Sequence, residues 1–535
     1  MHARLIFWSV TSALAGFLFG FDTIVISGAE ETFQRLWQLD ARMHGLATGM
    51  ALWGTVLGAI FGGIPAERYG RRKTLIVVGI LYFVSAVGSG IAPEVYTFMI
   101  ARFIGGLGVG AATVAAPMFI SEISPPGARG KLAGMFQFNI VFGILVALVS
   151  NWAFGQAMDM DVAWRWMLGI EAVPALIYTL MSFGLPESPR WLIVHARKRE
   201  EGAAIFRQLN PEAADEEIER LVAEVAETTR GTARTTGFWT RRLRVPILLA
   251  FLIAMFNQFS GINAVFYFAP RLLGLAGLED PLKASIALGL TNLVFTFIGL
   301  WLIDKIGRRA LLYIGSFGYI ISLAVASYTF LSTPTLKVAS LANDLAGAAE
   351  TLIKVEAGTR FMNPGDHREF EAGYAAKQTA LVEISKAEWF EGSVVVIPEG
   401  AGAEEVLEIA MAAKQEAGGL LGATGAIVLM ALVFFIAAHA VGQGAVIWVF
   451  ISEIFPNDHR AAGQALGSST HWVFAAGITT VFPYVIGAIG PGVMFGFFCV
   501  MMVLQLIWVR LMVPETKNVP LEALAKQLGM EDSSQ

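Results

Sequence analysis

The chain has 535 residues, of which 55% are hydrophobic and only 15% are charged. Soluble domains carry about 25% charged residues, so this composition, with a mean hydropathy of +0.61, excludes an ordinary water-soluble protein. The single cysteine, Cys499, excludes an internal disulfide framework and disfavours a cysteine-based metal site, and the net charge of −5 gives no indication of nucleic-acid binding.

Twelve apolar runs follow one another along the chain, six before and six after a polar stretch at 186–245. Each is long enough to cross about 30 Å of hydrocarbon as a helix. The runs lie near 5–28, 45–65, 74–93, 96–119, 132–154, 165–185, 246–268, 283–303, 310–331, 419–450, 461–486 and 490–513. Because backbone groups in lipid must be hydrogen-bonded within the chain, the runs predict an all-α membrane protein with twelve transmembrane helices, of which the first is an uncleaved span.

The basic residues gather in loops that all lie on one side of a twelve-span chain. These loops are ERYGRRK (67–73), ARGK (128–131), the 186–245 stretch and DKIGRR (304–309). The positive-inside rule places them in the cytoplasm together with both termini. We therefore expect 186–245 to be a cytoplasmic linker with short helices, and 514–535 to be a cytoplasmic tail.

A long polar insert, 332–418, follows the ninth run and is expected on the outer side. It contains 7 Lys/Arg against 14 Asp/Glu, so it is acidic. Residues 344–358 and 402–418 have helical spacing, and WFEGSVVVIPEG at 389–400 suggests a strand and a turn. Its role stays open between a lid, a partner-docking module and a tolerated surface insertion.

Three loop motifs occur twice in the same order. Gly70 and Gly307 lie 237 residues apart in similar loops, SEISPPGAR at 121–129 returns as SEIFPNDHR at 452–460, and PESPR at 186–190 returns as PETK at 514–517. The repeat predicts two related six-helix halves, 1–185 and 246–331 with 419–513. Such halves typically enclose a substrate site between them near the midplane of the membrane.

The repeated loops bring acidic and basic residues to the cytoplasmic rim. We expect these carboxylates to face arginines and to hold the two halves together in one state of a cytoplasmic gate. The residues of this gate are Glu67, Arg71, Glu122, Arg129, Asp304, Arg308, Glu453 and Arg460.

With these motifs in place, the chain resembles the sugar porter family of the major facilitator superfamily. The signatures that carry the resemblance are GGIPAERYGRRK, ARFIGGLGVGAA, PMFISEISPPGARG, PESPRWL, QFSGINAVFYFAP, DKIGRR, WVFISEIFPNDHR and PETKNVPLEAL. The resemblance implies a transporter with rocking alternating access, which moves a monosaccharide or polyol by facilitated diffusion or by proton symport. It implies neither an enzyme nor a cofactor, and the spans contain no metal-ligand or nucleophile motif.

A sugar site needs amides, which donate and accept hydrogen bonds, and an aromatic platform. Gln258 and Asn263 are five residues apart, and a break at Ser260–Gly261 would turn both toward the substrate, although membrane amides also join helices. The resemblance implies substrate contacts from Gln137, Gln258, Asn263, Asn292, Trp448, Tyr267 and Phe19. Among the positions that depart from the family pattern are Asn257 and His471, of which His471 is either a titrating group or a neutral hydrogen-bonding substitute.

Two charged residues lie deep in apolar runs, Asp22 in the first and Arg102 in the fourth. Charges in lipid are costly and mark ion or substrate pathways, although this pair could also be purely structural. The resemblance implies proton coupling through Asp22, because symporters of the family have aspartate there and facilitators usually have asparagine, and Glu171 matches another acidic position of the symporters.

We therefore predict a proton-coupled importer of a hexose, a pentose or a polyol. The alternative is a proton-independent sugar uniporter, and a nutrient sensor is disfavoured by the short C-terminal tail. The expected partners are the substrate, protons and the lipid bilayer, without nucleic acid, for a monomer in the inner (plasma) membrane.

Overall fold

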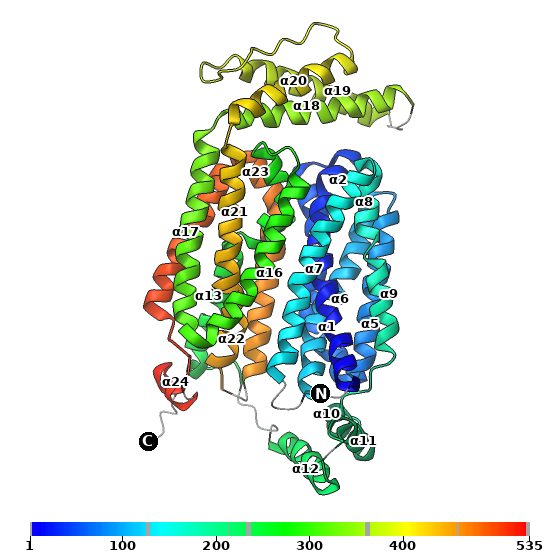
Figure 1. Ribbon diagram of the computed structural model, residues 1–535, viewed down its shortest axis with the longest axis vertical. Coiled ribbons are helices and arrows are strands. Elements are labelled where there is room, and N and C mark those ends of the chain that lie inside the picture. The colour runs from blue at the N-terminus through cyan, green and yellow to red at the C-terminus, as the bar shows by residue number, and fades with distance from the viewer. Residues whose placement is uncertain are drawn as a thin grey trace.

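A computed structural model describes residues 3–124, 129–211, 213–231, 237–358, 364–456, 459–519 and 521–530. The described residues form helices and connecting segments without a strand. Long helices form two groups side by side, and three further helices lie as a layer across one end of the bundle (Figure 1). We call that end the insert end. The opposite end, where the short helices after the sixth span and both termini lie, is called the linker end.

The first group contains six spans built from the N-terminal part of the chain. Its helices are α1 (Ala3–Val25), η1 (Ile26–Gly28), α2 (Glu30–Leu36), α3 (Ala41–Phe61), α4 (Gly63–Tyr69), α5 (Arg71–Ile91), α6 (Val95–Ile123), α7 (Arg129–Ala157), α8 (Met160–Gly169) and α9 (Ala172–Ser182). The sixth predicted span is formed by α8 and α9, which break at Ile170–Glu171, and α8 begins five residues before the apolar run at 165. Asp40 caps α3 by accepting a hydrogen bond from the Met43 backbone N–H at 2.7 Å.

The second group contains the other six spans. Its helices are α13 (Arg244–Phe259), α14 (Ile262–Tyr267), α15 (Ala269–Leu275), α16 (Pro281–Ile306), α17 (Arg308–Ser332), α21 (Thr424–Val441), α22 (Gln443–Ile454) and α23 (Arg460–Met512). The long α23 is two helices joined at Gly490, whose φ of 79° is not helical. Ten described helical stretches are long and apolar enough to span a membrane. The broken α8–α9 pair and the division of α23 supply the remaining two, so the prediction of twelve spans is confirmed.

Between the spans lie two helical additions. At the linker end are α10 (Pro189–Val194), α11 (Arg199–Leu209), α12 (Asp215–Gly231), η2 (Arg241–Leu243) and α24 (Leu521–Gln527). At the insert end are α18 (Thr335–Glu356), α19 (Pro364–Ser385) and α20 (Ala403–Leu421). The helices predicted over 344–358 and 402–418 are confirmed. The strand predicted within 389–400 is wrong: 393–398 has no regular secondary structure, and only the turn at Glu399–Gly400 is present.

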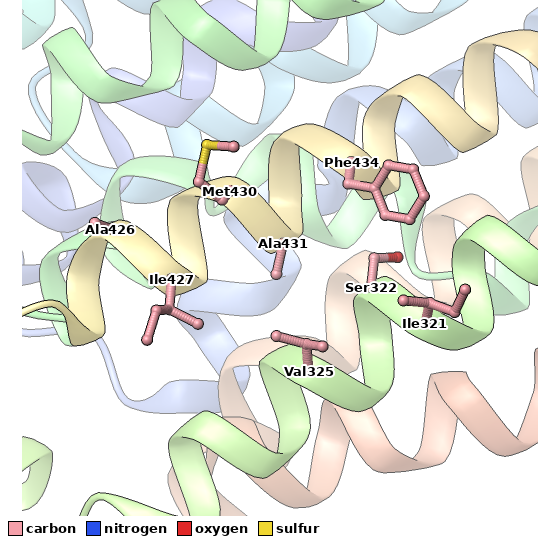
Figure 2. Close-up of a pocket in the computed structure, with 8 residues that line it drawn as sticks. All are labelled: Ile321, Ser322, Val325, Ala426, Ile427, Met430, Ala431 and Phe434. Carbon is pink, nitrogen blue, oxygen red and sulfur yellow. The ribbon is translucent and has the colours of Figure 1, made fainter.

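The outer surface of the bundle is apolar, as expected for contact with lipid. Large hydrophobic side chains are exposed along the spans, among them Trp301 at 60% and Leu180 at 62%. A shallow pocket on this surface lies between α17 and α21 (Figure 2). Its one polar side chain is Ser322, which already donates its hydroxyl to the Gly318 carbonyl at 2.8 Å. The pocket therefore lacks the amides and charges that a polar substrate needs.

Candidate functional site

The charged pair predicted in the first and fourth spans is present and buried. Arg102 donates through Nη1 to Asp22 Oδ1 at 2.6 Å and through Nη2 to the Asp22 backbone carbonyl at 2.9 Å. Both side chains are 1% exposed. Gly105, one turn after Arg102 on α6, leaves room for Ser85 of α5, because a Cβ at that position would collide with Ser85 Oγ. The ion pair therefore joins α1 to α6 inside the N-terminal half.

Glu171 lies at the break between α8 and α9 and faces the same pair. Its carboxylate interacts electrostatically with Asp22 and Arg102. It is 1% exposed, and among the described residues neither of its oxygens accepts a hydrogen bond. One guanidinium thus serves two buried carboxyl groups. Because an uncompensated buried charge costs several kcal/mol, a group of two acids and one guanidinium inside the membrane is a candidate functional centre.

The predicted amides form a connected network in the C-terminal half. Asn263 Nδ2 donates to Gln258 Oε1 at 2.8 Å, and Gln258 Nε2 donates to Asn257 Oδ1 at 2.9 Å. Gln258 Nε2 also lies 3.2 Å from both ring nitrogens of His471. Asn257 and His471, which both depart from the family pattern, thus contact the Gln258 amide.

The expected break in the seventh span explains how these amides meet. The helix stops at Phe259 and resumes at Ile262, and Gly261 between them has a φ of 88°, which favours glycine. A Cβ on Gly261 would also lie 2.5 Å from the Phe498 ring. The break brings side chains five residues apart within hydrogen-bond distance, which a straight helix would not do.

Aromatic rings adjoin the network. The Trp448 and His471 rings are 5.4 Å apart, the His471 and Trp472 rings 4.8 Å, and the Trp472 and Phe19 rings 5.6 Å. Phe19 belongs to α1, so this chain of rings passes from the C-terminal half to the N-terminal half. A row of rings of this kind is the apolar platform that a sugar ring would need.

Three other predicted substrate residues differ in their surroundings. Tyr267 is 1% exposed and interacts electrostatically with both Arg102 and Asp22 in the other half. Gln137 is partly buried in α7 and Asn292 is buried in α16. Within the described part of the chain, no hydrogen bond joins either of these two to the amide network.

At the linker end, Arg71 is the centre of the N-terminal rim cluster. Its guanidinium binds both oxygens of Glu122, through Nε at 3.0 Å and Nη2 at 2.8 Å, and donates to the Ala66 carbonyl at 2.9 Å. Glu187 accepts from the backbone N–H groups of Arg71 and Arg72. Gly70, with a φ of 100°, permits this approach, because a Cβ there would collide with Glu187 Oε2.

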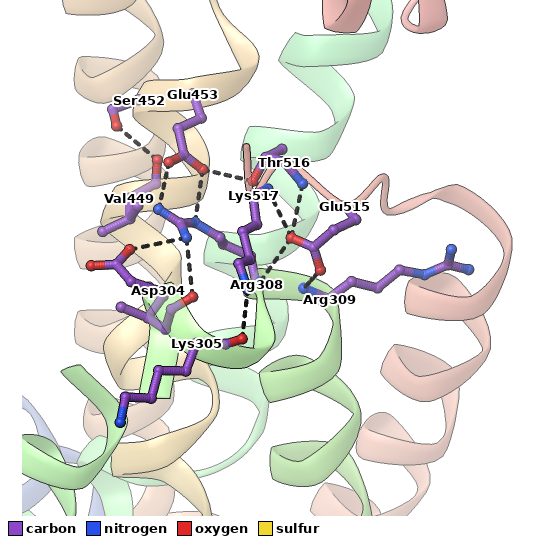
Figure 3. Close-up of polar contacts among 11 residues, drawn as sticks. Asp304, Lys305, Arg308, Arg309, Val449, Ser452, Glu453, Glu515, Thr516 and Lys517 are labelled. Carbon is purple, nitrogen blue, oxygen red and sulfur yellow. Dashed lines mark hydrogen bonds and ion pairs between the residues drawn. The ribbon is translucent and has the colours of Figure 1, made fainter. Parts of the chain in front are cut away.

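The C-terminal half repeats this cluster almost group for group (Figure 3). Arg308 binds both oxygens of Glu453 at 3.1 and 2.7 Å and donates to the Ile303 carbonyl at 3.0 Å. Glu515 accepts from the backbone N–H groups of Arg308 and Arg309 at 2.9 and 3.0 Å. Arg308 also contacts Asp304 at 3.2 Å.

The ion pairs observed at this rim lie within each half, because each joins the loop after a second span to the end of a fourth span. The role of these residues in holding the halves together in another state of the gate stays a prediction. Arg71 pairs with Glu122, whereas Glu67 is exposed and its backbone carbonyl accepts a hydrogen bond from Trp191 Nε1. The Arg129 side chain lies outside the described part of the chain. Arg460 lines a rim pocket with Asp304, Arg308 and Glu453, and its Nε has no hydrogen-bond partner among the described residues.

The sequence analysis did not single out two carboxylates of the rim clusters. Glu187 and Glu515 belong to PESPR and PETK, whose recurrence was the available signal. Each lies more than 100 residues from the glycine loop that it caps, so spacing alone could not identify its partner.

A buried charged cluster at the insert end was also missed. Arg271 of α15 binds both oxygens of Glu30 of α2, at 2.9 and 2.8 Å, and His44 Nε2 lies 2.8 Å from Glu30 Oε2. The Glu30 side chain is fully buried. Burial alone raises its pKa, but Arg271 and His44 outweigh burial and hold that pKa below its ordinary value of 4.5. Unlike the rim pairs, this pair joins the two halves.

Comparisons with known proteins agree with this geometry. The family model described as "Sugar (and other) transporter" matches residues 8–348 and 406–528. The chain is similar to a glucose transport protein of Synechocystis, with 30% identity over 96% of both chains, and to the arabinose-proton symporter of Bacillus subtilis, with 28% identity over 97% of this chain and 94% of the relative. Among solved structures, the inward open conformation of the xylose transporter XylE from E. coli matches with a TM-score of 0.72 and 26% identity, covering 98% of this chain and 99% of the other. The chain therefore belongs to the sugar porter family of the major facilitator superfamily.

Proposed function

We propose that this transporter imports a monosaccharide or a polyol together with a proton, by alternating access between its two halves. The observation that carries the proposal is the buried group of two carboxyls and one guanidinium, Asp22, Glu171 and Arg102. Charged side chains in a membrane interior are costly to desolvate and typically mark ion pathways. A proton that moves between the two acids would give this group such a role.

The proposed proton step follows from the charge balance. While Asp22 is ionised and paired with Arg102, Glu171 has no cation of its own and holds a proton. A proton from the outer side then binds Asp22 and weakens the ion pair, Glu171 releases its own proton toward the cytoplasm, and Arg102 turns to the ionised Glu171. When Arg102 returns, the proton on Asp22 passes to Glu171, so that one proton crosses the membrane in each cycle. A change of partner between two helix arrangements is the kind of event that biases a two-state equilibrium.

Coupling to sugar follows from the position of Tyr267. This residue belongs to the same broken span as Gln258 and Asn263, yet it faces Asp22 and Arg102. A shift of the ion pair would therefore act on the helix that carries the sugar amides. Conversely, a sugar bound to the amides would fix the position of Tyr267 against the proton site.

The proposal also includes the access state of this structure and the orientation of the protein in the membrane. Glu30–Arg271 closes the halves together at the insert end, whereas the described residues at the linker end include no ion pair between the halves. The basic loops support a cytoplasmic position for the linker end, both termini and the 186–245 linker. The structure then corresponds to a state open toward the cytoplasm, which agrees with its likeness to an inward open neighbour.

Relatives define the candidate substrates. Their names include arabinose-proton and D-xylose-proton symporters, a glucose transport protein and a myo-inositol transporter. The amide network suits any of these, because it recognises hydroxyl groups in general. We propose a hexose, a pentose or inositol and leave the choice to measurement.

The test is uptake of labelled glucose, xylose, arabinose and myo-inositol into proteoliposomes, with and without an imposed inward proton gradient. Symport predicts accumulation above the external concentration only with the gradient, and its loss on addition of a protonophore. Uptake that merely equilibrates, with the same rate in both conditions, would replace symport by facilitated diffusion.

A further inference from the structure

The insert at 335–421 is a folded layer with its own core and is not a loose loop. Buried side chains from its three helices pack on one another. They include Leu345, Leu352, Leu381, Val406 and Ala410. The layer is connected to the C-terminal half at both ends, through α17 and α21, and lies across the insert end (Figure 1). Any contact from the layer to the N-terminal half therefore links the two halves.

The layer makes such a contact through its first helix. Lys354 Nζ lies 2.7 Å from Asp161 Oδ2, at the first turn of α8 in the N-terminal half. Asp161 Oδ1 also accepts from Arg35 Nη2 of α2 at 2.5 Å. Gly347, two turns before Lys354, packs against Arg35, because a Cβ there would lie 3.8 Å from Arg35 Cδ. The helix α18 thus rests on two elements of the N-terminal half.

The charges at this contact are set to persist at neutral pH. Burial raises the pKa of Asp161, but Lys354 and Arg35 outweigh burial and hold that pKa below its ordinary value of 3.8. The side chains of Asp161 and Lys354 are only 20% and 32% exposed, so water screens them less than a free surface pair. A carboxylate shared by two cations is also a network, which is worth more than an isolated pair.

The contact lies over the buried pair that closes the halves. Insert residues Asp344 and Lys414 interact electrostatically with Glu31, beside Glu30, and Asp344 also interacts with Arg271. Leu421 at the end of α20 packs on Gly277 just after α15. The layer therefore covers the place where α2 and α15 must separate if the insert end opens.

We propose that α18–α20 is a strap that holds the insert end closed, through the bond of Lys354 to Asp161. The insert thereby sets the resting balance between the two access states. This inference rests on the alternating access of the proposed function, but not on the identity of the sugar or on proton coupling. It selects the lid among the roles that the sequence left open.

The test measures the distance between the halves at the insert end. Cysteines replace two exposed residues, Pro93 in the N-terminal half and Glu279 in the C-terminal half, in a Cys499→Ala background. Spin labels at these sites report the distance distribution of the purified protein in nanodiscs by pulsed electron paramagnetic resonance. Neither sugar nor a proton gradient is needed, so failure of the transport proposal would leave this readout intact.

The informative variant is Lys354→Gln, and its matched control is Lys337→Gln. Lys337 lies on the same helix, is exposed and has no charged partner among the described residues. Lys354→Gln should raise the ratio of the long-distance to the short-distance population about three- to tenfold, whereas Lys337→Gln should leave it unchanged. Asp161→Asn should give a shift at least as large, and adding Lys354→Gln to it should change little.

Parent-like distributions for both Lys354→Gln and Asp161→Asn would overturn the strap. Equal shifts for Lys354→Gln and Lys337→Gln would overturn it as well, because the effect would then reflect the net charge of the insert. Elution as a single monodisperse peak with a parent-like melting temperature would establish that the variants are folded before they are labelled.

Discussion

At the scale of single residues, Asp22 separates symport from facilitation. Asp22→Asn keeps the shape and a hydrogen-bonding group but removes the exchangeable proton. Accumulation against a gradient should vanish, while sugar counterflow should continue at least in part, because asparagine resembles a permanently protonated aspartate. Counterflow and gradient-driven uptake in proteoliposomes measure the two properties separately.

The exposed Glu279 provides the control for this prediction. Glu279→Gln removes an acid that lies far from Arg102 in the sequence and outside the apolar runs, so both measurements should match the parent. Accumulation by Asp22→Asn at the parent level would refute the coupling role.

Gln258 tests the sugar site in the same way. Three groups contact its amide: Asn257, Asn263 and His471. Gln258→Ala should weaken binding of the preferred sugar by on the order of 1–3 kcal/mol, roughly tenfold or more in Kd, because sugar hydroxyls lose a partner that both donates and accepts. Isothermal titration calorimetry would show it, with Gln208→Ala on the exposed face of α11 as the neutral control. An unchanged Kd would remove Gln258 from the site.

The residue chemistry of the site was accessible from the sequence, whereas its connections were not. The sequence itself shows amides beside a Ser-Gly pair and charged residues within apolar runs. The bonds of Gln258 to His471 and of Arg102 to Asp22 join residues 213 and 80 positions apart. Only packing of the spans decides such pairs.

At the scale of elements, the rim glycines depend on their backbone conformation. Gly307 has a φ of 94° and a ψ of 166°, a region almost exclusive to glycine, and a Cβ there would lie 2.5 Å from Glu515 Oε2. Gly307→Ala should therefore destabilise the C-terminal half by about 1–3 kcal/mol. A lower melting temperature in detergent would record the loss.

Gly477 is the matched control, since it lies inside α23 and a Cβ at this position would have no neighbouring atom within 4 Å among the described residues. Gly477→Ala should leave stability unchanged or raise it slightly, because alanine favours helix. Equal melting temperatures for both variants would show that the glycine conformation at the rim is not required.

The sequence predicted helices correctly where a periodic pattern was long. The prediction failed where contacts with other parts of the fold determine the local structure. The seventh span was expected to break at Ser260–Gly261, and it does. The segment 393–398 has the composition of a strand, but a strand needs a neighbour for its hydrogen bonds, and the layer offers helices instead. The loop repeats predicted the rim clusters but not that each cluster stays within one half.

At the scale of the whole molecule, the two ends of the bundle are built differently. The rim clusters brace each half internally and leave the linker end free of described ion pairs between the halves. The insert end carries the buried pair Glu30–Arg271 and, above it, Lys354–Asp161, and both link the halves. This asymmetry favours the state closed at the insert end, and the sequence repeat could not predict it, because the residues responsible lie outside the repeated motifs.

The buried pair should dominate that preference. Arg271→Gln would leave Glu30 as a fully buried carboxylate without a guanidinium, and removal of one partner from a buried pair costs about 3–5 kcal/mol. Separation of the halves exposes Glu30 to water and relieves this penalty. The insert end should therefore open in most molecules, a larger shift than Lys354→Gln produces, as measured with the same labels at positions 93 and 279.

Two further measurements decide whether charge is the cause. Glu30→Gln with Arg271→Gln removes both charges, so the closed state should recover much of its population relative to Arg271→Gln alone. In the parent, the lowered pKa of Glu30 means that its part of the closure is present above the ordinary carboxyl range and is lost only as the pH falls through a value below 4.5. Lowering the pH from about 7.5 to about 5.5 should therefore leave Glu30 ionised. Glu31 lies 3.6 Å from Arg271 and its pKa is raised to about 7 by burial, so it loses its charge in this range, and any opening seen there belongs to groups other than Glu30. A double variant as open as Arg271→Gln would show that the pair does not hold the halves together.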